Sequence, residues 1–172
     1  MELVIATSIL SVISASGVAI FMRTIRASSQ VQLRRNLDER ARLILNNMTN
    51  FFYPTRVMSA DGVDRDTCLM TGSVSANSVV LRNFDQLLTT ISINGTGQIA
   101  SASGATTVIV NPDGIVNVSA HNGGDSYFVW TCGNGVPDRL TFRFRAVVAG
   151  DQGDSGYSQD YSTDIVLRNS GN

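Results

Sequence analysis

Few residues in this 172-residue chain have the side chains that catalysis requires. His121 is the single histidine, and the string from Gly153 to Gly156 (Gly-Asp-Ser-Gly) matches the surroundings of some nucleophilic serines. A nucleophilic serine needs a histidine base and a carboxylate that orients the base. His121 lies in Ala-His-Asn-Gly-Gly, a turn sequence, and four-residue strings recur by chance. We therefore expect that the protein is not an enzyme.

Two groups of aspartates offer oxygen atoms of the kind that Ca²⁺ prefers. They are Asp61, Asp64 and Asp66 in the first group, and Asp151, Asp154 and Asp160 in the second. Neither spacing matches the twelve-residue calcium loop, and solvated acidic loops explain both groups better. We expect no metal or other cofactor, and the second group is the candidate if calcium binds at all.

Two cysteines, Cys68 and Cys132, lie far apart in the sequence. A pair so spaced in a small exported domain usually forms one disulfide. Closing so long a loop stabilises the fold by roughly 4 kcal/mol in the chain-entropy model. Two cysteines and one histidine without a Cys-x-x-Cys motif are too few ligands for a zinc site.

An uncharged apolar stretch, Leu3–Met22, dominates the start of the chain. About 20 residues at about 1.5 Å each give roughly 30 Å, the thickness of the hydrocarbon layer of a membrane. Glu2 precedes the stretch, and Arg23 and Arg26 follow it. A cleavable secretory signal has a basic start and a shorter apolar core, so it fits poorly. A membrane anchor fits, but it does not account for Glu2.

The opening residues Met1-Glu-Leu-Val-Ile-Ala6 resemble the mature N-terminus of type IV pilins and type II secretion pseudopilins. That family carries glutamate at its fifth mature position, whereas Glu2 is second here, and the family's helix-loosening proline is absent. The resemblance covers about the first 50 residues. It implies that the cytoplasmic membrane holds the apolar helix before an assembly machinery moves it into a bundle of identical helices. It also implies that Met1 and Glu2 direct assembly, where the Glu2 carboxylate pairs with the free α-amine of a neighbouring subunit.

The segment around Ser14, Ser16 and Gly17 is the weakest helical stretch of this apolar region. Glycine costs about 1 kcal/mol relative to alanine in a helix, and serine competes for backbone hydrogen bonds. Related filaments unwind in this zone. The resemblance therefore implies local extension within residues 14–22 once subunits are packed.

An apolar repeat of three and four residues continues beyond the apolar stretch and indicates one helical face. Its members are Leu33, Leu37, Ala41, Ile44, Met48 and Phe52. We expect one helix from Glu2 to Tyr53, apolar over 1–22, amphipathic over 23–53 and ended by Pro54. About 50 residues span about 75 Å, so the N-terminal half needs apolar cover from outside its own domain.

The remainder predicts a connecting loop over 54–77 and an antiparallel β-sheet head over 78–172. The expected strands are Ser78–Arg82, Leu87–Ile93 with a return at Gln98–Ala100, a hairpin over 106–119, Tyr127–Cys132, Leu140–Val148 and Thr163–Arg168. Residues 150–161 read as a polar loop. The fold class is therefore α+β, and the resemblance implies the type IV pilin arrangement, in which the C-terminal half of the helix packs on the sheet.

Charge is unevenly distributed along the chain. Residues 1–56 hold seven arginines and three acids, a balance of +4, and residues 57–172 hold six arginines and eleven aspartates, a balance of −5. This split suggests contacts between the head of one copy and the helix of another. Arg143 and Arg145 fall on the outward face of an expected strand, where solvated sheet residues explain them better than contact with DNA, a host surface or another partner.

Three functions remain open from the sequence. The first is the major subunit of a bacterial surface filament used in adhesion, motility or DNA uptake. The second is a minor pilin or a secretion pseudopilin, and the third is a membrane-anchored surface domain that never polymerises. The apolar stretch with Glu2 favours the first two over the third. The sequence does not separate the first from the second.

Overall fold

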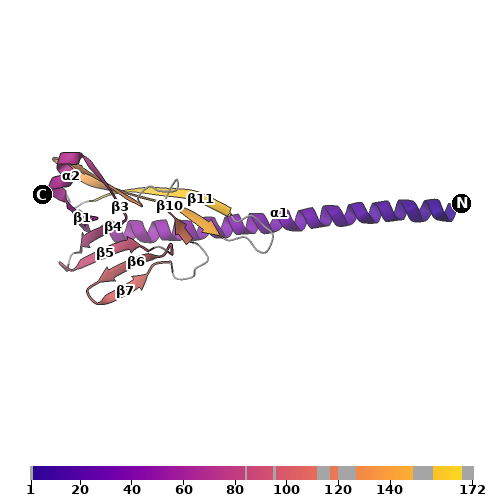
Figure 1. The fold of residues 1–172 in the computed structure, drawn as a ribbon, viewed down its shortest axis with the longest axis horizontal. Helices are drawn as coiled ribbons and strands as arrows, with labels where there is room; N and C mark the ends of the chain where they lie inside the picture. Colours follow the sequence, from indigo (N-terminus) through magenta and orange to yellow (C-terminus); the bar gives the residue numbers. More distant parts are fainter. Residues whose placement is uncertain are drawn as a thin grey trace. The chain divides into compact units, whose positions relative to one another are not determined.

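The computed structural model describes residues 2–83, 85–94, 96–111, 117–119, 127–148 and 157–167, with Glu2 and Asn117 described by their backbone only. The chain divides into two compact units, Met1–Asn36 and Leu37–Asn172. A single helix, α1 (Glu2–Phe52), supplies the first unit and enters the second (Figure 1). Strands follow it, so the α+β class expected from the sequence is confirmed.

The last four turns of α1 supply one wall of the core of the second unit. Its buried side chains are Leu37, Ala41, Ile44, Met48 and Phe52, each at most 3% exposed. Spacings of three and four place them on one helical face, as the sequence predicts. The helix ends at Phe52 because proline at position 54 disfavours helical backbone in the residue before it.

The strands form two antiparallel sheets, whereas the sequence predicted one (Figure 1). The first sheet has the order β2-β1-β4-β5-β6-β7, and the second has the order β11-β10-β9-β3 with β8 also paired to β10. The bounds are β1 Arg56–Ala60, β2 Val63–Asp64, β3 Ser73–Ala76, β4 Ser78–Arg82, β5 Leu88–Ile93, β6 Ile99–Ser103, β7 Thr106–Ile109, β8 Asn117–Ser119, β9 Phe128–Gly133, β10 Val136–Val148 and β11 Tyr157–Val166.

The segment 54–77, expected to be a connecting loop, contains β1, β2, β3 and the short helix α2 (Arg65–Thr71). Asp64 caps α2, because its Oδ1 accepts a hydrogen bond of 3.0 Å from the backbone N–H of Thr67. Gly72 ends it at φ 78°. Elements of two to seven residues are too short for apolar periodicity to reveal, so the sequence prediction was wrong here.

The predicted hairpin over 106–119 is also wrong. Its first arm, β7, pairs with β6, and its second arm, β8, pairs with β10 in the other sheet. Residues 112–116, which hold most of the predicted turn, lie outside the described residues. The backbone N–H of Val118 donates to the Gly97 carbonyl at 3.1 Å, so β8 is held against the turn between β5 and β6. By contrast, the predicted return after Asn94 is confirmed by pairing of β5 with β6.

Strand β11 begins at Tyr157, inside the stretch that the sequence predicted as a polar loop. Ten residue pairs join it to β10, from Val148↔Tyr157 to Arg139↔Val166. Most of its side chains are exposed, and its sequence does not alternate between apolar and polar residues as that of a half-buried strand does. The strand is specified by pairing with the strongly patterned β10 rather than by its own residues.

A row of aromatic rings runs through the core of the second unit. Phe52 of α1 contacts Phe128 of β9 with ring centroids 6.0 Å apart, and Phe128 stacks on Phe142 of β10 at 5.1 Å. The row continues through Phe144 to Tyr161 of β11. These contacts fasten the C-terminal part of α1 to the second sheet.

Candidate functional site: the apolar segment of α1

The apolar segment of α1, Leu3–Met22, is exposed along its whole length. Leu3 is 77% exposed, Val12 is 68% exposed and Phe21 is 64% exposed. Burying one such side chain is worth about 1.5–3 kcal/mol. A run of them therefore makes the segment strongly unfavourable in water, and this segment requires apolar cover from lipid or from other protein chains.

Length and composition suffice for this part of α1 to span a membrane. It is the one helix of this kind among the described residues, and no residue of its most apolar stretch is buried. A span must satisfy its own backbone polar groups, which an unbroken helix does. The expected membrane anchor thus has the physical properties that anchoring requires.

Hydroxyl groups within the apolar segment are satisfied by the helix itself. Ser8 Oγ donates to the Val4 carbonyl at 2.8 Å, and Ser14 Oγ donates to the Leu10 carbonyl at 2.8 Å. Ser16 forms the same kind of bond. Each hydroxyl therefore carries a smaller desolvation penalty on entering an apolar environment.

The segment expected to loosen, Ser14 to Gly17, is helical in the single chain. A Cβ added at Gly17 would meet nothing within 4 Å, so no neighbour in this structure requires glycine there. The expected extension concerns subunits packed in a filament, and it stays a prediction.

The two residues expected to direct assembly stand at the start of the helix. Met1 lies outside the described residues, and Glu2 is described by its helical backbone alone. The pairing of the Glu2 carboxylate with the α-amine of a neighbouring chain therefore stays a prediction.

The predicted disulfide between Cys68 and Cys132 is confirmed. Their Cα atoms lie 5.8 Å apart, and the bridge joins α2 to β9. Cys68 is fully buried and Cys132 is 7% exposed. The bridge therefore closes the second unit around the segment that the sequence predicted as a loop.

A partly buried ion pair between α2 and β10 was missed by the sequence reasoning. Arg65 Nε donates to Asp138 Oδ2 at 3.0 Å, and Arg65 Nη2 donates to Oδ1 at 3.3 Å. Asp138 is fully buried. A signal was present, because Asp138 is in phase with the inward residues Leu140 and Phe142 of β10. An acid on the apolar face of a strand predicts a buried partner.

A second polar link joins α1 to β11. The Tyr161 hydroxyl donates a hydrogen bond to Asp38 Oδ1. Burial and this hydrogen bond raise the pKa of the Tyr161 phenol well above its usual range. With the aromatic row, this link holds the start of the buried part of α1 against the second sheet.

Two of the aspartates considered as calcium ligands, Asp61 and Asp64, have other roles, and the third of that group, Asp66, lies in the first turn of α2. Asp61 accepts hydrogen bonds from the backbone N–H groups of Asn77 and Ser78 at 2.7 and 2.8 Å. Asp64 caps α2, and hydrogen bonds from Thr67 lower the pKa of its carboxyl group. Within the described residues no cluster of three metal-ligating side chains occurs.

In the second aspartate group, Asp151 and Asp154 lie outside the described residues, as do His121 and the Gly153–Gly156 string. Asp160 lies on β11 and accepts hydrogen bonds from Arg145 of β10 at 2.8 and 3.0 Å. This pairing raises the pKa of the Arg145 guanidinium. Asp160 is thus the partner of Arg145, and the possible calcium site stays a prediction.

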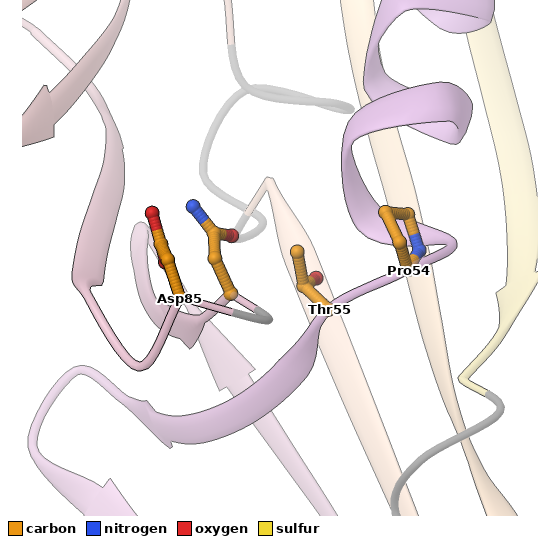
Figure 2. A pocket seen from close by; sticks show the side chains of 4 residues that line it. Pro54, Thr55 and Asp85 are labelled. Atoms are coloured by element: carbon orange, nitrogen blue, oxygen red, sulfur yellow. The ribbon is translucent and has the colours of Figure 1, made fainter.

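An open pocket of about 280 Å³ lies where α1 gives way to β1, lined by Pro54, Thr55, Asn83 and Asp85 (Figure 2). Its polar groups have local partners. Thr55 Oγ1 donates to the Phe52 carbonyl at 2.9 Å, and Asp85 accepts from the backbone N–H of Leu87. These bonds stabilise the turns that line the pocket.

Comparison of the chain with protein-family models, with curated protein sequences and with solved structures found no match.

Proposed function

We propose that this protein is a structural subunit of a bacterial type IV pilus or a related surface filament. The observation that carries the proposal is the exposed apolar segment Leu3–Met22, joined within α1 to a disulfide-closed β-domain. The pilin-like arrangement of the whole fold, with a helix that anchors first and polymerises later, is part of the same proposal.

Assembly in this proposal exchanges one apolar environment for another. Before assembly, lipid covers the exposed side chains of Leu3–Met22, with the β-domain outside the cytoplasmic membrane. After assembly, the same side chains are covered by identical helices of neighbouring subunits. Because apolar surface is covered in both states, the transfer is nearly balanced, and small docking terms decide it.

Glu2 supplies such a docking term. A carboxylate moved into an apolar helix bundle is strongly penalised unless it is paired. The free α-amine of a neighbouring subunit is the cation that we propose for this pair, because Leu3–Met22 itself contains no charge. The pair therefore sets the axial position of one subunit against the next more than it adds stability.

The test compares Glu2→Ala with Glu39→Ala, which removes an exposed acid later in the same helix. We expect Glu2→Ala to leave normal amounts of subunit in the membrane fraction, while electron microscopy of sheared surface fractions shows filaments reduced about tenfold or more. Glu39→Ala is expected to form filaments at the wild-type level. Wild-type filament yield from Glu2→Ala would refute the docking role of Glu2.

The same sheared fractions separate the remaining alternatives. A major subunit would dominate their protein content, and a minor pilin or pseudopilin would be a trace component. A membrane-anchored surface domain would be absent from them and would stay with the cells. Complete absence of the wild-type chain from sheared filaments would refute the proposed polymer.

A further inference from the structure

Two arginines directly follow the apolar segment of α1. Arg23 and Arg26 are three residues apart, so their Cβ atoms lie on the same side of the helix, about 5–6 Å from each other. Both side chains are exposed. Within the described part of the chain, neither guanidinium has a hydrogen-bond or ion-pair partner.

The position of the two arginines coincides with one surface of a bilayer. If Leu3–Met22 fills the hydrocarbon layer of about 30 Å, Arg23 begins the headgroup layer, which is about 5–8 Å thick on each side. Lipid phosphates lie in this layer. A guanidinium group donates two parallel hydrogen bonds to a phosphate, and its long stem can follow the apolar edge.

No acid in the same stretch of the helix neutralises this positive charge. The sequence has no aspartate or glutamate between Leu3 and Leu37, and Arg34 and Arg35 add to the positive charge. Arg34 begins about 18 Å beyond the end of the apolar segment, which is outside the headgroup layer. Arg23 and Arg26 are therefore the two arginines at the depth of the phosphates.

The usual role of basic residues in setting the orientation of a membrane span does not explain Arg23 and Arg26. Basic residues usually mark the cytoplasmic end of a span. The disulfide between Cys68 and Cys132 is typical of an oxidising, non-cytoplasmic compartment, and the proposed function places the domain that follows Arg23 and Arg26 there. The arginine pair therefore lies on the side that this rule disfavours, which calls for another role.

We propose that Arg23 and Arg26 bind the phosphate of anionic lipids in the leaflet at the C-terminal end of the apolar segment. This inference rests on the membrane-anchored stage of the proposed function. The arginine pair would set the depth of the waiting subunit in the membrane, and extraction into a filament would require release of these lipids.

The test uses the full-length chain reconstituted into phosphatidylcholine vesicles with trace spin-labelled phosphatidylglycerol or phosphatidylcholine. Electron paramagnetic resonance measures the fraction of each label that the protein immobilises. We expect a preference of about threefold or more for phosphatidylglycerol, which falls toward one in 1 M salt because salt screens charge. Arg23→Gln/Arg26→Gln is expected to lose this preference.

The matched control is Arg34→Gln/Arg35→Gln, which removes the same charge from the same helix at a greater distance from the apolar segment. It should keep the wild-type preference. Equal loss in both double variants would overturn the inference, because the preference would then reflect net charge. Wild-type preference in Arg23→Gln/Arg26→Gln, with altered filament yield instead, would also overturn it and assign the pair to a second copy of the chain.

The result also separates this inference from the function on which it rests. Immobilised lipid without a phosphatidylglycerol preference would refute the arginine–phosphate contact and leave the membrane anchor intact. No immobilised lipid of either kind for the wild-type chain would refute the membrane anchor, and the arginine contact with it.

Discussion

At the scale of single residues, the Arg65–Asp138 pair shows how a buried charge is tolerated. The guanidinium donates to both carboxylate oxygens, and the carboxylate is fully buried. A buried ion pair adds little net stability, but removing one partner leaves an uncompensated charge. The pair therefore makes the packing of α2 on β10 sensitive to substitution.

Arg65→Met should lower the free energy of unfolding by about 3 kcal/mol, because the fully buried Asp138 carboxylate loses both charge-assisted hydrogen bonds from Arg65. Urea unfolding of the detergent-solubilised chain, followed by fluorescence of the single tryptophan, measures this loss. Arg145→Met removes the cation of the half-exposed pair with Asp160 and should cost clearly less. Equal losses in the two variants would contradict this interpretation of burial.

The Tyr161–Asp38 link predicts a pH dependence of stability. Burial and the hydrogen bond to Asp38 raise the pKa of Tyr161 in the folded state. Below about pH 10 the phenol is protonated in both states, so its stabilisation is complete. Above pH 10 the unfolded chain loses this proton first, so stability falls as pH rises.

Tyr161→Phe should therefore flatten the decrease in the urea midpoint between about pH 9 and 11. It should not abolish the decrease, because burial also raises the pKa of Tyr127. Tyr53→Phe, which removes the hydroxyl of a side chain 43% exposed, is the control and should keep the wild-type profile. Identical profiles for Tyr161→Phe and wild type would show that Tyr161 does not contribute.

At the scale of elements, α1 has different surroundings along its length. Residues from Leu37 onward alternate between a buried apolar face and a polar face, as in a helix packed on one side. Residues 3–22 are uncharged and predominantly apolar, and they are exposed on every side. A helix that is apolar all round is buried on all sides in its functional state.

Phe52→Ala tests the packing of α1 on the second sheet. Phe52 is fully buried and contacts Phe128, so its truncation should cost about 3–5 kcal/mol. Leu43→Ala truncates a side chain of the same helix that is 61% exposed and should stay within about 0.5 kcal/mol of wild type. Urea unfolding of both variants provides the comparison. A similar small effect in both would mean that the helix is not held by its apolar face.

At the scale of the whole molecule, the two units match the two roles that we propose, an apolar helix that anchors and polymerises and a β-domain that lies outside the membrane. The unit Leu37–Asn172 has its own buried core and disulfide, and its strands are paired within it. The unit Met1–Asn36 is a helix without a core. The unit Leu37–Asn172 can be stable in water, and the unit Met1–Asn36 depends on an apolar environment supplied from outside.

Charges in the middle of the apolar segment should prevent membrane association. Each arginine near the centre of a span costs about 2.5–3.5 kcal/mol on the insertion scale. Ile9→Arg/Ile13→Arg should therefore shift most of the chain from the membrane pellet to the supernatant after alkaline carbonate extraction. Leu43→Arg/Tyr53→Arg changes two exposed side chains of the second unit and should stay in the pellet. Retention of both variants would refute the span.

Patterns that repeat within one element allowed the sequence by itself to predict much of this protein. They include the charge-free stretch Leu3–Met22, the apolar face of α1 and the alternation along β10. Each depends on residues that are near neighbours in the chain, so helical or strand periodicity reveals them. The bridge from Cys68 to Cys132 was predictable for a different reason, because two cysteines allow only one pairing.

Only the tertiary structure decided which strands pair. It separated β7 from β8 into different sheets, extended β11 through a polar stretch and placed Arg65 against Asp138. The physical reason is that a strand satisfies its hydrogen bonds with any partner of suitable register, so its own residues do not specify the neighbour. That choice depends on the packing of the whole core, to which residues far apart in the chain contribute together.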